Sequence, residues 1–559
     1  MGLDGFRAYD QEVAALYRSR RWWLGLTMGD MFDKSCDLYP GKVAVVGGGK
    51  RYTHAELRQL VDTLAFNLLD EGFKPGDRVL LQLPNWPEFA IAYFALQKAG
   101  LIPVLLTVNH TAREVSHLLR LTEPAGWILP TSYRSVPDYE EVVQEIRKET
   151  ASVGKVIFVG EKPKTSGLSL HQLLVPRASE AEVRAVLEQV RPGPGAVCQL
   201  LPSGGTTGLP KCAPRTHDDY ICNIEYKSRA WDLNATDTCL VSTTVGHNLA
   251  LLVCLTAMIF HGGTSVIVDS SLPEDFCQAI QDERVTCAGF VPTLISRLAT
   301  FDRLHEYDLS SLKKVYVGAA NSPPELIRKV EEKLGCRYFN AFGMVEGPCS
   351  QTRTGDSLEV RCQTIGHPVC PYDDFRTLDR DGNPTPAGQE GELAAKGPGI
   401  FTGYYRNPQA NQAAFTLDGY FRTGDLAVID ETGRIRITGR IKDIIIRGGE
   451  NIAARDVEDL ISSHPAVEYV AVVGMPDQEL GEKVCAYLTT ANGCTLSHEE
   501  LVGHMLRMGS AKALLPARIE FMSQIPLTAA GKADKKALRA DIEARMKHAS
   551  TIMKFHVNA

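Results

Sequence analysis

The residue types best suited to chemistry are concentrated in one short stretch near the middle of the chain. It consists of Ser203, Gly204, Gly205, Thr206, Thr207, Gly208, Leu209, Pro210 and Lys211. Its glycines let the backbone turn tightly and bring N–H groups close to an anion. Its hydroxyls can donate to phosphate oxygens, and its lysine adds a positive charge. Composition alone leaves two interpretations open, a phosphate-binding loop and a flexible surface loop.

The spacing of this stretch excludes two common nucleotide-binding patterns. A P-loop ends in Gly-Lys-Ser or Gly-Lys-Thr and continues into a helix, whereas Pro210 here precedes Lys211. The glycines also do not follow the Gly-x-Gly-x-x-Gly pattern of dinucleotide-binding folds. A phosphate site at this stretch would therefore belong to another class.

The stretch resembles, nearly letter for letter, the phosphate loop of the adenylate-forming enzymes, the ANL superfamily. These are the acyl- and aryl-CoA synthetases, the luciferases and the adenylation domains of peptide synthetases. Residues 214–220, which read Pro-Arg-Thr-His-Asp-Asp-Tyr, narrow the resemblance to the stand-alone aryl-acid AMP ligases of the 2,3-dihydroxybenzoate and salicylate type. These ligases load carrier proteins in siderophore and related pathways. Six motifs in the family's order extend the resemblance over almost the whole chain.

The resemblance implies a nucleotide site for ATP and Mg²⁺. Phe342 can stack on the adenine base, and Glu346 is placed to hold the metal, although alone it would read as a solvated loop acid. Asp425 is similar to the carboxylate that accepts both ribose hydroxyls, and Arg440 to a residue that reaches ribose and phosphate. The implied ATP-binding residues are Ser203, Gly204, Gly205, Thr206, Thr207, Gly208, Lys211, Ala319, Asn340, Phe342, Gly343, Asp425 and Arg440.

A second set of residues is similar to the acid pocket of the family. His247 holds the position of a catalytic residue near the acyl carboxylate, although a lone histidine is more often structural. Asn248 matches the residue that bonds the ortho hydroxyl of the ring, and a buried Asn without a partner would be costly. Positions 249 and 253, where we expect Tyr and Ser in dihydroxybenzoate ligases, are apolar here, which disfavours a catechol acid. The predicted pocket consists of Asn248, Leu249, Val253, Gly318 and Ala320.

The motifs near the C-terminus resemble those of a moving lid. Lys532, which follows Pro526 and Thr528, is identified by this resemblance as the catalytic lysine. Lys442 occupies the hinge position of the family. Gly448 and Gly449 resemble the loop that lines the pantetheine tunnel in the second half-reaction. Rotation about Lys442 would withdraw Lys532 and bring this thiolation loop to the site.

The order of strand-like and helix-like segments predicts an α/β fold. Apolar strands at 79–83 and 103–106 flank a helix at 89–99, the rhythm of parallel βαβ units. Thr53 followed by Glu56 predicts a capping box at a helix start. The apolar run 249–260 has twelve residues, too few to span a bilayer, and predicts a buried helix.

Turn signals and a change of pattern predict two domains. Turns at 382–384 and 430–433 favour a small antiparallel, barrel-like region. Beyond it, short strands alternate with helices at 454–462 and 498–508. We expect a large N-terminal domain of stacked sheets with helices and a barrel-like subdomain, residues 1–441. It would be hinged to a small C-terminal α+β lid domain, residues 442–559.

Composition limits the class of protein. The 559 residues are 44% hydrophobic and 23% charged, which is typical of a globular protein. A net charge of −7 argues against a nucleic-acid partner. The first 23 residues lack a signal-peptide core, and the 14 cysteines form no metal or redox motif. We expect a cytoplasmic protein that has reduced cysteines and does not span a membrane.

The combined hypothesis is an aryl-acid AMP ligase. It would join an aromatic acid to AMP with release of pyrophosphate, then pass the acyl group to the phosphopantetheine arm of an aryl carrier protein. The main alternative is an aryl-CoA ligase that uses free CoA. A regulatory ATP-binding protein with a dead site is a third class, and the intact Lys532, Asp425 and Glu346 argue against it.

Overall fold

A computed structural model describes most of the chain. It covers residues 3–134, 136, 138–150, 153–160, 167–203, 209–448, 450–477, 479–490, 494–528 and 532–557, with the backbone alone for 149 and 547–557. Within these residues no helix is long and apolar enough to cross a membrane. All 14 cysteines are free thiols, and only Cys494 is exposed.

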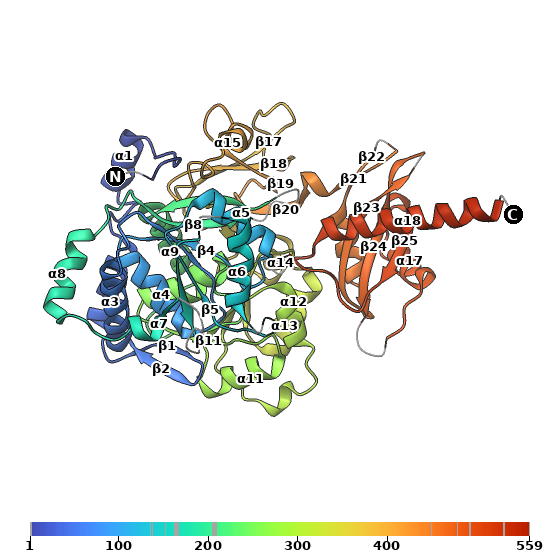
Figure 1. The fold of residues 1–559 in the computed structure, drawn as a ribbon. Helices are drawn as coiled ribbons and strands as arrows, with labels where there is room; N and C mark the ends of the chain where they lie inside the picture. The colour runs from blue at the N-terminus through green and yellow to red at the C-terminus, as the bar shows by residue number, and fades with distance from the viewer. Residues whose placement is uncertain are drawn as a thin grey trace.

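Two large, mainly parallel sheets build the N-terminal part (Figure 1). The nine-stranded sheet contains, in spatial order, β16 (His367–Pro368), β15 (Cys349–Gln351), β14 (Arg337–Gly343), β13 (Lys314–Val317), β12 (Cys287–Phe290), β10 (Thr238–Val241), β11 (Thr264–Ile267), β1 (Val43–Gly47) and β2 (Lys50–Thr53). The seven-stranded sheet contains β7 (Leu168–Ser169), β6 (Lys155–Val159), β5 (Gly126–Pro130), β3 (Arg78–Leu81), β4 (Ile102–Leu105), β8 (Val197–Ser203) and β9 (Lys211–Thr216). The predicted parallel βαβ pairing is present between β3 and β4.

Helices pack between and around these two sheets. They are α1 (Gln11–Ser19), α2 (Met28–Leu38), α3 (His54–Asp70), α4 (Pro87–Lys98), α5 (Ala112–Thr122), α6 (Tyr139–Glu149), α7 (Leu170–Leu173), α8 (Glu180–Val190), α9 (His217–Ala230), α10 (Ala257–Phe260), α11 (Pro273–Asp282), α12 (Pro292–Ala299), α13 (Pro324–Leu334), α14 (Leu358–Gln363) and α15 (Pro408–Ala414), with a 3-10 turn η2 (Leu304–Glu306). Helix α4 contacts β1 of one sheet and β3 and β4 of the other, which explains why its apolar residues are buried on all sides. One apolar core therefore joins the two sheets.

Two local predictions are confirmed in this part. Helix α3 begins with the capping box formed by Thr53 and Glu56. The apolar run 249–260 forms a buried π-helix, η1 (Ala250–Thr256), that continues into α10. Apolar periodicity predicts a buried helix but does not distinguish π from α geometry, and π-helical turns are frequent at functional sites.

The third sheet is antiparallel. Its strands are β17 (Asp374–Leu378), β18 (Glu390–Lys396), β19 (Phe421–Ile429) and β20 (Ile435–Arg440), paired in chain order. The predicted turn at 430–433 closes the β19–β20 hairpin, where the N–H of Gly433 donates to the carbonyl of Asp430. The hairpin places Asp425 opposite Arg440.

The last sheet lies to one side of the others (Figure 1). It pairs β22 (Glu450–Ala453), β21 (Ile444–Arg447), β24 (Gly481–Thr490) and β23 (Val467–Asp477), with β25 (Arg518–Phe521) on β24. Around it lie α16 (Ala454–Ser462), α17 (His498–Arg507), the 3-10 turn η4 (Lys512–Leu514) and α18 (Lys535–Val557). The predicted boundary at 442 falls in the 3-10 turn η3 (Ile441–Asp443), between two sheets that share no strand, and it stays a prediction.

Candidate active site

The β8–β9 hairpin carries the predicted phosphate loop. Ser203 and Lys211 lie opposite each other where the strands meet the loop. Of the predicted loop residues between them, 204–208 lie outside the described residues. The hydroxyl of Ser203 donates to Oε1 of Glu346 over 2.8 Å. The structure thus brings together the predicted phosphate-binding and metal-binding motifs, which are 143 residues apart in sequence.

Glu346 is a buried carboxylate with two hydroxyl partners. It is 2% exposed, and Oε1 also accepts from the hydroxyl of Tyr404 over 2.9 Å. The ammonium of Lys211 lies 4.5 Å from the centre of the Tyr404 ring. Within the described residues no cationic side chain forms an ion pair with Glu346. Hydroxyl donors with no paired cation leave the carboxylate suited to a hard metal ion.

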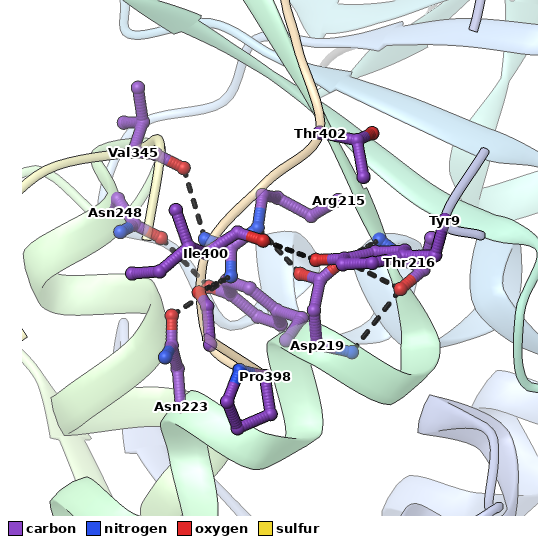
Figure 2. A network of polar contacts seen from close by, with 12 residues as sticks. Tyr9, Arg215, Thr216, Asp219, Asn223, Asn248, Val345, Pro398, Ile400 and Thr402 are labelled. Carbon is purple, nitrogen blue, oxygen red and sulfur yellow. Dashed lines mark hydrogen bonds and ion pairs between the residues drawn. The ribbon is translucent and has the colours of Figure 1, made fainter. Parts of the chain in front are cut away.

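Arg215 holds the segment around Glu346 to the core. Arg215 is completely buried, and its Nε donates to Asp219 over 2.6 Å. Its other nitrogens donate to the carbonyls of Val345 (3.0 Å) and Gly399 (2.9 Å) and to Oδ1 of Asn223 (2.9 Å). Figure 2 shows the guanidinium at the centre of these contacts. Because Val345 precedes Glu346, this network fixes the backbone that presents the carboxylate.

The acid-pocket residues lie at the start of η1. Oδ1 of Asn248 accepts a 2.9 Å hydrogen bond from the hydroxyl of Tyr220 on α9. The amide NH₂ of Asn248 therefore remains as a donor. Leu249 lies beside two glycines: its methyl groups are 3.6 Å from where a Cβ on Gly289 or Gly318 would stand. Val253 is buried in the same helix.

His247 is neutral at physiological pH. Burial, with further contributions from Lys532 and His110, lowers the pKa of His247 to about 4. Its Nδ1 accepts from the N–H of Leu249 over 3.4 Å. A neutral imidazole can donate from its other nitrogen to a carboxylate without abstracting a proton.

The edge of β13 and β14 supplies the small and aromatic residues of the predicted nucleotide site. Ala319 has a left-handed φ of 72°, which is strained for a residue with a Cβ. Ala320 is half-buried beside it. Phe342 packs against the core of the antiparallel sheet and keeps part of its ring exposed. The amide NH₂ of Asn340 donates to the carbonyls of Arg361 and Thr364. Both donors of this predicted ATP-binding residue are therefore used within the protein.

Asp425 and Arg440 form an ion pair across β19 and β20. Nε of Arg440 lies 2.8 Å from Oδ1 of Asp425, which is 7% exposed. Burial raises the pKa of Asp425, and Arg440 and Lys532 oppose that effect. The second carboxylate oxygen remains available to accept hydrogen bonds from a ligand.

Lys532 reaches this site from the C-terminal part. Burial and the charge of Arg440 lower its pKa, while Asp425 and Glu346 raise it. Together with its effect on His247, this places the ammonium among four predicted site residues from different elements. A local hairpin holds the loop, since the N–H of Thr528 donates to the carbonyl of Lys532 over 2.7 Å.

Of the remaining lid residues, Lys442 lies close enough to Lys211 for its charge to help lower the pKa of that lysine. Lys442 is exposed in η3, and its carbonyl accepts from Arg539 of α18. Gly448 has a left-handed φ of 59° in the β21–β22 turn, and its N–H donates to Leu480 of the same domain. Gly449 lies outside the described residues. In this arrangement Lys532, rather than Gly448, lies close enough to Arg440, Asp425 and Glu346 for their charges to shift its pKa.

Comparison with known proteins identifies the family. The model of the AMP-binding enzyme family matches residues 32–405, and that of the AMP-binding enzyme C-terminal domain matches 456–532. The chain belongs to the AMP-binding enzyme family. It is 37% identical over 548 residues to "Salicyl-AMP ligase / salicyl-S-ArCP synthetase" of Mycobacterium tuberculosis, covering 96% of this chain and 94% of that one.

Two further relatives of this AMP-binding enzyme agree over nearly the full length. "Salicylyl-CoA synthase / salicylate adenylyltransferase" of a Streptomyces species is 35% identical, covering 96% of this chain and 98% of that one. The apo structure of MbtA from Mycobacterium smegmatis superposes with a TM-score of 0.72 at 34% identity. That comparison covers 96% of this chain and 99% of the other, and it confirms the predicted fold.

Sequence reasoning missed three residues of this AMP-binding enzyme's site. No sequence pattern indicates a role for Tyr404, because its partner Glu346 lies 58 residues away in the chain. Tyr220 and Arg215 lie in the segment 214–220, which contains an i, i+4 Arg–Asp pair and a Thr-x-x-Asp capping box. That pairing could have indicated a buried structural ion pair at the start of α9.

Proposed function

We propose that this protein activates an aromatic carboxylic acid as its acyl-adenylate and then transfers the acyl group to a phosphopantetheine thiol. The names of the two salicylate relatives support the acid class and the adenylate. The name of the first also supports an aryl carrier protein as the acceptor. The apolar Leu249 and the donor amide of Asn248 support a ring with one polar ortho group.

The convergence of Lys532 with Glu346, Asp425 and His247 is the observation that carries this proposal. In the first step a carboxylate oxygen of the acid attacks the α-phosphorus of ATP. A C–O–P linkage forms, the bond from the α-phosphorus to the bridging oxygen breaks, and pyrophosphate leaves. The carboxylate is already ionised, so no general base is required. Because two anions must meet, positioned cations supply most of the rate enhancement.

Lys532 would lie between the acid carboxylate and the α-phosphate, where it neutralises charge on both. An incoming carboxylate and phosphate favour its ammonium form, which opposes the desolvation that lowers its pKa. His247 would donate to the acid carboxylate. Asp425 would accept the ribose hydroxyls, and Arg440 favours its ionised form.

The residues around Glu346 fit a hard divalent cation. The carboxylate is buried, oxygen-rich and free of a paired cation within the described residues. Bound Mg²⁺ would neutralise the phosphates of ATP and of the leaving pyrophosphate. Ser203 and Tyr404 orient the carboxylate toward the ligand, and Lys211 contributes a second positive charge beside the loop.

The second half-reaction would need the lid to move. Lys442 would act as the pivot, and Gly448 and Gly449 would replace Lys532 at the site. The thiol would attack the acyl carbon, and AMP would leave with the carboxylate oxygen that it had bonded. Free CoA is the alternative acceptor, because the second relative is named a salicylyl-CoA synthase.

Exchange of labelled pyrophosphate into ATP tests the proposed first step. We expect exchange to depend on an added aromatic acid, with salicylate well above benzoate. Thioester formation should be faster with phosphopantetheinylated carrier protein than with free CoA. Exchange that requires an aliphatic acid, or that proceeds equally without any acid, would contradict the proposal.

A further inference from the structure

A buried lysine lies beside Gly343, a predicted site residue. Lys227 is on α9, is 3% exposed, and donates to the hydroxyl of Tyr316 on β13. Its ammonium is 4.8 Å from the centre of the Tyr316 ring. Within the described residues its polar partners are Tyr316 and Cys349, and no carboxylate pairs with it. A buried cation without a carboxylate is costly, which calls for a reason other than stability.

The charge on this lysine is retained. Burial alone would lower the pKa of Lys227, but Cys349 and Tyr316 outweigh that effect and raise the pKa above its ordinary value. Lys227 is therefore an ammonium with three donors at neutral pH. Tyr316 and Cys349 use two of them, which leaves one for a further acceptor.

Lys227 approaches the site at Gly343. Gly343 pairs with Cys349 across β14 and β15, and its backbone is exposed to solvent. A Cβ on Gly343 would stand 3.8 Å from Nζ of Lys227 and 3.5 Å from Sγ of Cys349. Because Gly343 has no side chain, the ammonium lies close to the exposed backbone of a predicted ATP-binding residue.

Two polar side chains on one face of α9 point toward predicted site residues. Tyr220 contacts Asn248, and Lys227 lies seven residues further along the helix. Seven residues correspond to two turns, about 10 Å along the axis. Tyr220 and Lys227 therefore leave α9 in nearly the same direction, Tyr220 toward Asn248 and Lys227 toward Gly343.

We propose that Lys227 is a specificity residue, with Tyr316 and Cys349 as its positioning partners. It would bind a hydrogen-bond acceptor on the edge of the aromatic acid remote from the carboxylate. The acceptor is a ring nitrogen or an oxygen substituent, and an ionised oxygen would bind most strongly. This inference rests on the proposed aryl-acid activity and adds to it a second recognition point besides Asn248.

Matched acids that differ only in an acceptor test the inference on the wild-type enzyme. We would compare naphthalene-2-carboxylate with quinoline carboxylates whose nitrogen occupies successive distal positions, and 3- and 4-methylbenzoate with isophthalate and terephthalate. Acid-dependent pyrophosphate exchange gives kcat/KM for each acid. At least one acceptor-bearing acid should exceed its matched partner about tenfold or more. If none does, the inference is wrong.

The variant Lys227→Met tests the same point from the protein side. It should reduce that wild-type preference about tenfold or more, mainly through KM of the acid, because methionine has similar length and no charge. The control Lys314→Met removes a neighbouring lysine that bonds Asp232 and Asp237 instead. The control should keep the wild-type ratio between matched acids. An unchanged ratio in folded Lys227→Met overturns the assignment.

Failure of the inference and failure of the proposed function give different results. If no aromatic acid supports exchange in the wild-type protein, the proposed function fails and the role of Lys227 falls with it. If aromatic acids support exchange but matched pairs react alike, only the role of Lys227 fails. Calorimetric binding of the same acids to the ATP-free protein gives a second readout that does not depend on turnover.

Discussion

Arg215 and Lys532 are both cations close to Glu346, and they differ in how fully they are bound. The guanidinium of Arg215 donates to a carboxylate, an amide oxygen and two carbonyls, all within the core. Lys532 is half-buried, and no described residue accepts from its ammonium. A cation such as Arg215, whose donors are all used, therefore stabilises the framework. A cation such as Lys532, whose donors are free, is available to a ligand.

The largest expected effect is on stability at Arg215. The variant Arg215→Met leaves Asp219 buried without its cationic partner, with Thr216 still donating to it, and frees the Val345 and Gly399 carbonyls. We expect a loss of about 3–5 kcal/mol in the free energy of unfolding, measured by urea denaturation. The control Arg229→Met removes an exposed cation from α9, the helix that carries Asp219, and should cost about 0.5 kcal/mol or less. Equal losses in the two variants would show that the buried network is not the framework.

The next effect is on catalysis at Lys532. The variant Lys532→Ala should lower acid-dependent pyrophosphate exchange about a hundredfold or more, the value of about 3–4 kcal/mol of lost transition-state stabilisation. Its free energy of unfolding should match wild type, because no described contact is lost from the side chain. Transfer from a supplied acyl-adenylate to the thiol should persist. Near-normal exchange would remove Lys532 from the first step.

A smaller effect is expected at the predicted hinge. Lys442→Pro fixes the φ angle in η3 and restricts rotation of the lid. We expect thioester formation to fall about tenfold or more while pyrophosphate exchange largely survives, since Lys532 already lies in the site. The control Lys442→Ala removes the same side chain but leaves the backbone free to rotate, so it separates loss of the side chain from loss of rotation. Equal effects on both half-reactions would show that Lys442 is not the pivot.

The smallest effect is expected at Ala319. Its φ of 72° is unfavourable for alanine and ordinary for glycine. The variant Ala319→Gly should therefore stabilise the protein by about 1 kcal/mol, measured as a rise in the free energy of unfolding. A loss of stability would mean that the methyl group contributes more packing than its backbone strain costs.

Local patterns predicted much of the fold. The capping box at Thr53 and the bounds of α16 at 454–462 follow from residues within a few positions of each other. The motifs of the site could also be recognised in the sequence, because each consists of a few consecutive residues. Whether those motifs carry the roles that we propose for them stays a prediction.

Long-range contacts could not be predicted from the same patterns. Arg215 bonds carbonyls 130 and 184 residues away, and no local spacing indicates which ones. No local pattern in the sequence indicates that Lys227 is buried. Only the tertiary structure, with Tyr316 of β13 and Cys349 of β15 as its partners, shows that this lysine is buried. Burial of a charged residue is decided by tertiary structure, which a single sequence does not display.

The most direct test of the central claim follows an oxygen atom. The proposed attack of the acid carboxylate on the α-phosphorus transfers one carboxylate oxygen to AMP. We would incubate the enzyme with ATP, Mg²⁺, the thiol acceptor and salicylate whose carboxylate carries oxygen-18, and analyse the products by mass spectrometry. The account predicts one oxygen-18 atom in AMP and none in pyrophosphate. Unlabelled AMP, or label in inorganic phosphate accompanied by ADP, would contradict it.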